Sequence, residues 1–90
     1  MSRASFGFFL RGAREAQRIS LRRAAKAARI SPTYLSDVEL DRCVPSTHVA
    51  RRLADAIGLD VVEVLARRAL AAAPQTLDQA RETVRREEGL

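Results

Sequence analysis

Apolar side chains recur at intervals of three and four residues along almost the whole of this sequence, as in Phe6, Phe9, Leu10 and Ala13. This spacing places the apolar residues on one face of a helix, whereas a half-buried strand would need strict alternation, which the sequence does not show. The pattern therefore predicts an all-α chain. The helices are expected over about residues 5–17, 21–28, 32–40, 47–57, 61–72 and 76–90.

Polar residues, glycine and proline mark the ends of these predicted helices. A short side-chain oxygen can accept from a free N–H in the first turn, and four of the predicted helices follow such an N-cap residue. These residues are Ser20, Ser31, Ser46 and Asp60. Gly58 is suited to end a helix in the left-handed conformation, and Pro74 breaks the chain. We therefore predict a five-helix bundle over residues 1–73 and a C-terminal helical extension over residues 74–90.

Length and composition exclude several classes of protein. Ninety residues allow one small domain with a modest core. A single cysteine and a single histidine provide neither a disulfide nor the four ligands of a structural zinc site. The sequence contains no nucleophile–base pair and no phosphate-binding glycine loop, so we expect no enzymatic activity, metal or cofactor. No apolar run approaches the ~20 residues that span a bilayer, and we expect a cytoplasmic protein without a membrane partner.

Basic residues are concentrated in the first part of the chain. Residues 1–54 contain eleven basic and four acidic side chains, whereas residues 55–90 contain five basic and seven acidic ones. A basic surface confined to one part of a chain indicates binding to a polyanion there. The excess of arginine over lysine has a second explanation in a GC-rich genome, so composition alone leaves nucleic-acid binding open.

The spacing of residues 20–42 predicts two short helices joined by a three-residue turn. Ala25 is small enough to let the two helices approach closely. Ile30 lies in the turn, where it fills the gap beneath them, and Leu35 and Val38 of the second helix reach the same core. This is the construction of a helix-turn-helix, whose second helix enters the major groove of DNA.

These residues resemble the repressor and Cro-type helix-turn-helix family, also called the Xre family. The resemblance extends from about Phe6 to Leu70 and includes Pro45-Ser46 and the segment LADAIGLDVVEVL. It implies a five-helix repressor-like bundle that binds double-stranded DNA. Arg29 and Asp41 depart from the family, which usually has glycine at both positions. Because such positions often require a positive φ, the geometry of the two turns is in question.

The resemblance also implies roles for particular side chains. The positions expected to face base edges are Pro32, Thr33, Ser36 and Asp37. Arg14 and Glu39 stand where the family pairs an arginine of the first helix with the glutamate that ends the recognition helix. Between Pro32 and Glu39 there is no Arg, Asn or Gln, the side chains that make the strongest contacts with guanine and adenine. We therefore expect modest direct readout, supplemented by DNA shape or by Arg42.

Contacts with phosphates are expected around the recognition helix. The residues predicted for them are Ser20, Arg22, Tyr34 and Arg42, followed by Arg18 and Arg29. Such contacts position a domain on DNA and weaken with salt, without selecting a sequence. For four later arginines we expect solvated surface positions: Arg51, Arg52, Arg67 and Arg68.

The last part of the chain carries an apolar stripe with little core of its own. We predict that it forms a homodimer interface through Leu70, Leu77, Ala80 and Val84, which would place two recognition helices about one DNA turn, ~34 Å, apart. The competing interpretation is an amphipathic tail that does not dimerise.

Two functions remain open at this point. The first is a sequence-specific transcriptional regulator, a repressor that binds a palindromic operator as a dimer. The second is an antitoxin or interaction module that uses the same fold to bind a partner protein such as a toxin, a protease or a polymerase. The basic first half favours the regulator, whereas Asp37 and the weak set of base-reading side chains slightly favour the interaction module.

Overall fold

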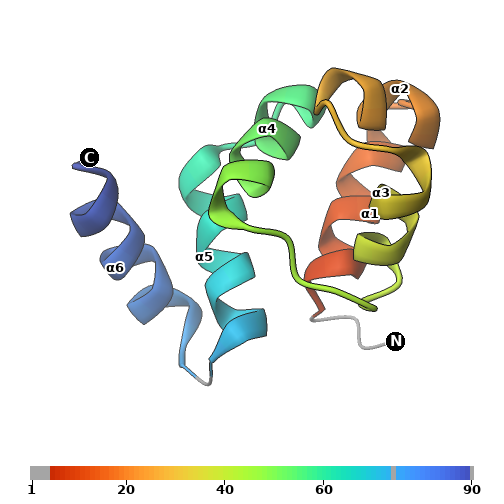
Figure 1. The fold of residues 1–90 in the computed structure, drawn as a ribbon. Helices are drawn as coiled ribbons and strands as arrows, with labels where there is room; N and C mark the ends of the chain where they lie inside the picture. Colours follow the sequence, from red (N-terminus) through yellow and green to blue (C-terminus); the bar gives the residue numbers. More distant parts are fainter. Residues whose placement is uncertain (1–4, 74, 90) are drawn as a thin grey trace.

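The computed structural model describes residues 5–73 and 75–89, and all of its regular elements are helices (Figure 1). They are α1 (Phe6–Ala16), α2 (Leu21–Ala27), α3 (Pro32–Glu39), α4 (Thr47–Ile57), α5 (Val61–Ala72) and α6 (Leu77–Glu88). This confirms the predicted all-α class. None of these helices combines the length and the apolar character needed to cross a membrane. Pro74, at which we placed the domain boundary, lies outside the described residues.

A side-chain oxygen caps the N-terminus of every described helix. The predicted caps Ser20, Ser31 and Ser46 accept from the backbone N–H three residues later at 3.0–3.2 Å. Asp60 accepts from Val62 at 2.8 Å. Two further caps complete the set: Ser5, which the sequence analysis missed, and Thr76, which forms a reciprocal capping box with Gln79. Each cap typically contributes about 1 kcal/mol, so the six short helices have well-defined starts.

After each of the first three helices, a residue other than glycine adopts the left-handed backbone conformation. The angle φ is 57° at Arg18, 61° at Arg29 and 60° at Asp41. After Asp41, the N–H of Arg42 donates to the carbonyl of Asp37 at 2.9 Å, which is the 6→1 bond of a Schellman motif. The two positions that depart from the family thus keep the backbone conformation that glycine usually provides. Arg18 is a third such position.

Asp41 has a second role that glycine could not perform. Its carboxylate Oδ1 accepts from the N–H of Gly7 at 2.9 Å, in the first turn of α1. A negative charge at a helix N-terminus is favourable because the free N–H groups and the helix dipole both attract it. Aspartate therefore ties the end of α3 to the start of α1.

We expect Arg29→Gly to raise the free energy of unfolding by about 0.5–1 kcal/mol. The left-handed conformation costs a residue with a Cβ roughly 1–2 kcal/mol, and the extra chain entropy of glycine offsets part of the gain. Asp41→Gly relieves the same strain but loses the acceptor for Gly7, so we expect almost no net change. Urea denaturation of the two variants measures the difference. Equal stabilisation by both substitutions would contradict the capping role of Asp41.

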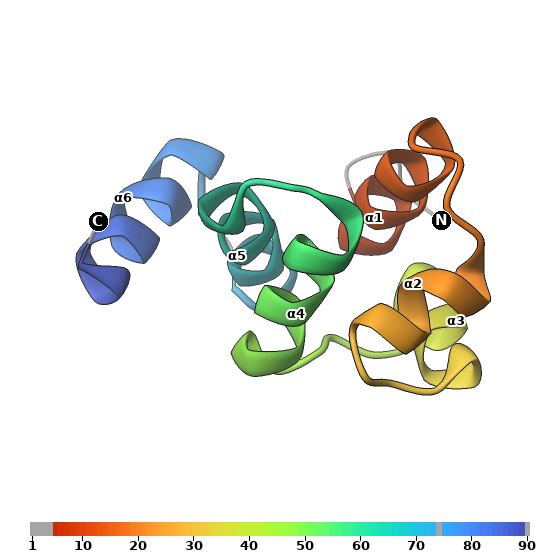
Figure 2. The same ribbon diagram turned by 90° about the horizontal axis from the view of Figure 1, so that it is seen from above.

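The main core lies where α1 to α5 converge. Leu10, Leu35, Leu53, Ile57 and Val64 are fully buried. The small residues of α2 permit close packing against α3 and α4, since Ala24 and Ala25 are also buried. Figure 1 and Figure 2 both place α2 and α3 at one end of the molecule and α6 at the other, with α4 and α5 between them. The helix-turn-helix is thus not covered by the C-terminal helix.

The apolar stripe of α6 packs on α5 of the same chain. Ala80 is fully buried and Val84 is 6% exposed, while Leu70 and Leu77 are half-buried against the same core. The stripe therefore has a partner, α5, within the same chain, which the sequence did not lead us to expect. The homodimer through these four residues stays a prediction. The sequence showed an amphipathic helix but not which surface its apolar face would contact.

Ion pairs hold α6 in this position. Arg81 donates from Nε to Glu63 of α5 at 2.9 Å, and Arg51 of α4 pairs with Glu88. Within α6 itself, Nη1 of Arg81 also donates to Asp78 at 3.1 Å. The hydrogen bonds from Arg81 lower the pKa of Glu63. The charged form of Glu63 is thus favoured, and α6 is bound to α5 by charge as well as by apolar contact.

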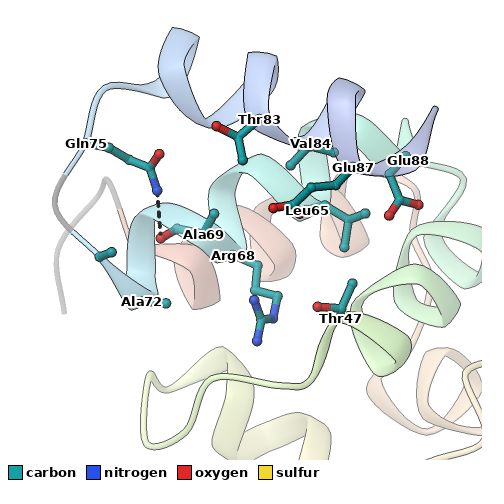
Figure 3. A pocket seen from close by; sticks show the side chains of 11 residues that line it. Thr47, Leu65, Arg68, Ala69, Ala72, Gln75, Thr83, Val84, Glu87 and Glu88 are labelled. Carbon is teal, nitrogen blue, oxygen red and sulfur yellow. Dashed lines mark hydrogen bonds between the residues drawn. The ribbon is translucent and has the colours of Figure 1, made fainter. Parts of the chain in front are cut away.

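A cleft of about 280 Å³ remains between α5, α6 and the start of α4 (Figure 3). Leu65 and Val84 contribute apolar side chains to its lining, and Arg68 contributes a guanidinium group. The Nε of Arg68 donates to the carbonyl of Pro45 at 2.6 Å, and Gln75 donates to the carbonyl of Ala69 at 3.3 Å. Both polar groups therefore secure the backbone around the cleft.

Candidate nucleic-acid interface

The helix-turn-helix is formed by α2, the turn at residues 28–31 and α3. Ala25 is fully buried at the contact between the two helices, and the N–H of Ile30 donates to the Ala25 carbonyl at 3.0 Å. Ile30 packs against the core from the turn, and Leu35 and Val38 are fully buried beneath α3. These four side chains pack one face of α3 against the core, so its other face points toward solvent.

An ion pair fixes α3 to α1. Arg14 donates from Nε to Oε2 of Glu39 at 2.8 Å and from Nη2 to Oε1 at 3.0 Å, and its Nη1 donates to the carbonyl of Ile19 at 2.9 Å. The side chains of Arg14 and Glu39 are only 11% and 5% exposed. The hydrogen bond to Glu39 raises the pKa of Arg14. A buried bidentate pair of this kind sets the position of one helix relative to another.

The solvent-facing side of α3 borders an open groove of about 370 Å³. All four residues predicted to face base edges line it, together with two of the predicted phosphate contacts. The lining residues are Leu21, Arg22, Pro32, Thr33, Ser36, Asp37 and Arg42. The fold thus gathers hydroxyl groups, a carboxylate and two guanidinium groups around one recognition helix.

The other predicted phosphate contacts are not among the residues that line this groove. Ser20 is exposed and uses its Oγ to accept from the Arg23 N–H at 3.1 Å. Tyr34 is half-buried and packs against the core. Arg18 and Arg29 are exposed at the turns after α1 and α2. They extend the basic surface around α2 and α3.

Asp37 and Arg42 pair with each other inside the groove, which the sequence analysis did not anticipate. Nη1 of Arg42 donates to Oδ1 of Asp37 at 3.2 Å. The pair joins residues five positions apart, an interval that does not bring side chains together on a straight helix. It forms here because the left-handed Asp41 turns the chain back toward α3. The acidic charge that weighed against DNA binding therefore has a cationic partner.

The later arginines were predicted to be solvated, and for three of them this is wrong. Arg52 donates from Nε to the carbonyl of Ala28 at 2.7 Å, where α2 ends, and Arg68 donates to the carbonyl of Pro45. Arg67 stacks over the ring of Phe9, with its Cζ 4.4 Å from the ring centroid. These guanidinium groups stabilise the frame that positions α2 and α3. Only tertiary structure shows which carbonyl or ring lies within reach.

Comparisons with known proteins agree with this geometry. Residues 5–70 match the family model of the helix-turn-helix domain. The chain is also similar to a solved structure, the clp gene regulator ClgR from C. glutamicum, with 36% identity over 81% of this chain and 95% of that chain and a TM-score of 0.64. No curated protein matches it.

The fold and the groove define a DNA-binding protein of the helix-turn-helix class. Because the family model covers residues 5–70, the chain belongs to the helix-turn-helix domain family and is of the Xre-like kind. The resemblance predicted from the sequence is thereby confirmed.

Proposed function

We propose that this protein is a sequence-specific transcriptional regulator that acts as a repressor by occupying promoter DNA. The observation that carries the proposal is the groove at α3, where the predicted base-contacting residues and two arginines line one open surface. The similarity to a protein described as a gene regulator supports it. The ion pair between Asp37 and Arg42 weakens one of the two features that favoured a protein-binding role.

Sequence-specific binding should depend on the hydroxyl groups of Thr33 and Ser36. We expect the double variant T33A/S36A to lose specific retention of the upstream intergenic DNA in a mobility-shift titration while retaining salt-sensitive binding to unrelated DNA. Thr83→Ala on α6 is the matched control, because Thr83 is exposed and lies at the other end of the molecule. Wild-type protein that binds every sequence equally would contradict the proposal. A folded protein that ignores DNA and retains a toxin, protease or polymerase would support the interaction module instead.

Arg22 should supply affinity without selectivity. We expect Arg22→Ala to weaken binding to specific and unrelated DNA by the same factor, and to reduce the slope of log affinity against log salt by about 0.9. Arg86→Ala is the charge-matched control, since Arg86 is exposed on α6 and far from the groove. Fluorescence anisotropy at four salt concentrations measures both slopes. A reduced slope for both variants would show that net charge, rather than a phosphate contact at Arg22, sets the salt dependence.

The operator is proposed to be a palindrome occupied by two copies of the chain. Only four residues of the eight-residue α3 line the groove, which is too few to distinguish one site from the many competing sequences in a genome. Two recognition helices spaced about one DNA turn, ~34 Å, would double the contacts. Sedimentation of the protein with one or two inverted half-sites tests the stoichiometry. A single copy bound to the full site with the same affinity as to the half-site would contradict this arrangement.

Repression is the direction of regulation expected when a regulator covers a promoter. A reporter gene behind the selected operator should give less transcript when the protein is expressed, and the T33A/S36A variant should restore the signal. An increase in transcript with the wild-type protein would identify an activator instead.

A further inference from the structure

The recognition helix lacks the side chain that best recognises guanine, but the groove contains one. Between Pro32 and Glu39, α3 has no Arg, Lys, Asn or Gln. The guanidinium of Arg42 lies three residues beyond the last residue of α3 and lines the same groove as Thr33 and Ser36. Two parallel N–H groups of an arginine match O6 and N7 of guanine in the major groove.

The backbone of Arg42 is held in place from both sides. Its own N–H donates to the carbonyl of Asp37 at 2.9 Å, and the preceding residue, Asp41, is fixed to α1 through Gly7. Arg42 is therefore part of the Schellman motif that ends α3, rather than of a free loop. Its Cα keeps a defined position relative to the recognition helix.

The side chain of Arg42 is held at one nitrogen and free at the others. Nη1 donates to Oδ1 of Asp37 at 3.2 Å, while the Arg42 side chain remains 68% exposed. A guanidinium has five N–H groups, so one bond to Asp37 leaves two parallel donors available to a base. The carboxylate also limits the conformations of a long side chain, which lowers the entropy lost on binding.

We propose that Arg42 recognises a guanine in the major groove and that Asp37 positions its guanidinium for that contact. The inference rests on the proposed function, because it assigns a base to the DNA site described above. It replaces the prediction that Arg42 contacts a phosphate. It also gives Asp37 a positioning role instead of a direct contact with cytosine.

The test is selection of binding sites from a library of randomised double-stranded DNA by the full-length chain, followed by competition binding. We expect the wild-type protein to enrich guanine at one position of each half-site. Arg42→Ala should flatten the preference at that position alone, with discrimination against the other bases falling about ten- to hundredfold. Arg42→Lys preserves the charge and any phosphate contact but lacks the planar pair of donors, so it should weaken the guanine preference less than Arg42→Ala does.

Asp37→Asn tests the positioning role. It removes a negative charge from the groove, so affinity for unrelated DNA should rise while discrimination at the guanine position falls severalfold. If Asp37 only stabilised the fold, its replacement would not raise the affinity for unrelated DNA while lowering the discrimination at the guanine position. Circular dichroism should show the same helix content for all variants, since both side chains lie at the surface of the groove.

The possible failures are distinguishable. A weaker affinity of Arg42→Ala with an unchanged base preference would place Arg42 on a phosphate and overturn this inference, while leaving the proposed function intact. Loss of the base preference with Asp37→Asn but not with Arg42→Ala would show that Asp37 contacts cytosine directly, and would also overturn it. A wild-type protein that enriches no sequence would overturn both the inference and the proposed function.

Discussion

Replacing Arg14 by methionine is expected to lower the free energy of unfolding by about 3–5 kcal/mol, the largest single-residue effect that we expect from a charged side chain here. The substitution preserves most of the apolar stem but leaves the carboxylate of Glu39, 5% exposed, without its cationic partner. A buried charge without a partner loses its hydration and gains nothing in return. Because α3 would lose one of its two polar links to α1, specific DNA binding should fall together with stability.

Two further variants separate the ion pair from the packing around it. The double variant R14M/E39L removes both charges and should recover most of the lost stability. Arg11→Met breaks the exposed pair with Glu15, whose side chains are 49% and 56% exposed, and should cost less than about 0.5 kcal/mol. Denaturant titration gives all three values. If Arg14→Met costs no more than Arg11→Met, the buried pair does not stabilise the fold in solution.

Features that depend on neighbouring residues were predictable from the sequence. The caps at Ser20, Ser31 and Ser46 and the left-handed Gly58 follow from local chemistry, because the capping atom and its partner lie within a few residues. The helix-turn-helix was also predictable, because α2 and α3 are consecutive helices and the small, buried Ala25 lets them approach closely across one short turn. The pairing of Arg14 with Glu39 was predicted from the family resemblance, which shows the two positions at which the family carries this pair.

Features that depend on distant carbonyls or surfaces were not predictable in this way. Arg52 contacts the end of α2, and the stripe at Ala80 and Val84 contacts α5, and neither partner can be inferred from local spacing. The pair between Asp37 and Arg42 was missed for a different reason. It requires the left-handed Asp41, and the sequence showed that position only as a departure from the usual glycine. The part of the candidate site that is proposed to select a base thus depends on the left-handed conformation of Asp41 directly after α3.

The close approach of α1 to the end of α3 at Gly7 gives the second large effect. We expect Gly7→Ala to lower the free energy of unfolding by about 2 kcal/mol. A Cβ at this position would lie 2.3 Å from the carbonyl oxygen of Glu39 and 2.6 Å from that of Val38. Both atoms belong to the backbone, so one helix must move, and overpacking of this kind costs up to about 3 kcal/mol before the better helix propensity of alanine offsets part of it.

Gly12→Ala, in the same helix, should have the opposite sign. A Cβ at Gly12 meets nothing within 4 Å, so the substitution gains helix propensity alone and should stabilise the protein by up to about 1 kcal/mol. Thermal unfolding of both variants measures the difference between their stabilities. Because the contact at Gly7 involves the last residues of α3, Gly7→Ala should also shift the end of the recognition helix and weaken specific DNA binding, whereas Gly12→Ala should leave binding unchanged. Stabilisation by both alanines would mean that α1 and α3 are farther apart in solution. The contact between Asp41 and Gly7 would then not fix the backbone next to Arg42 to α1.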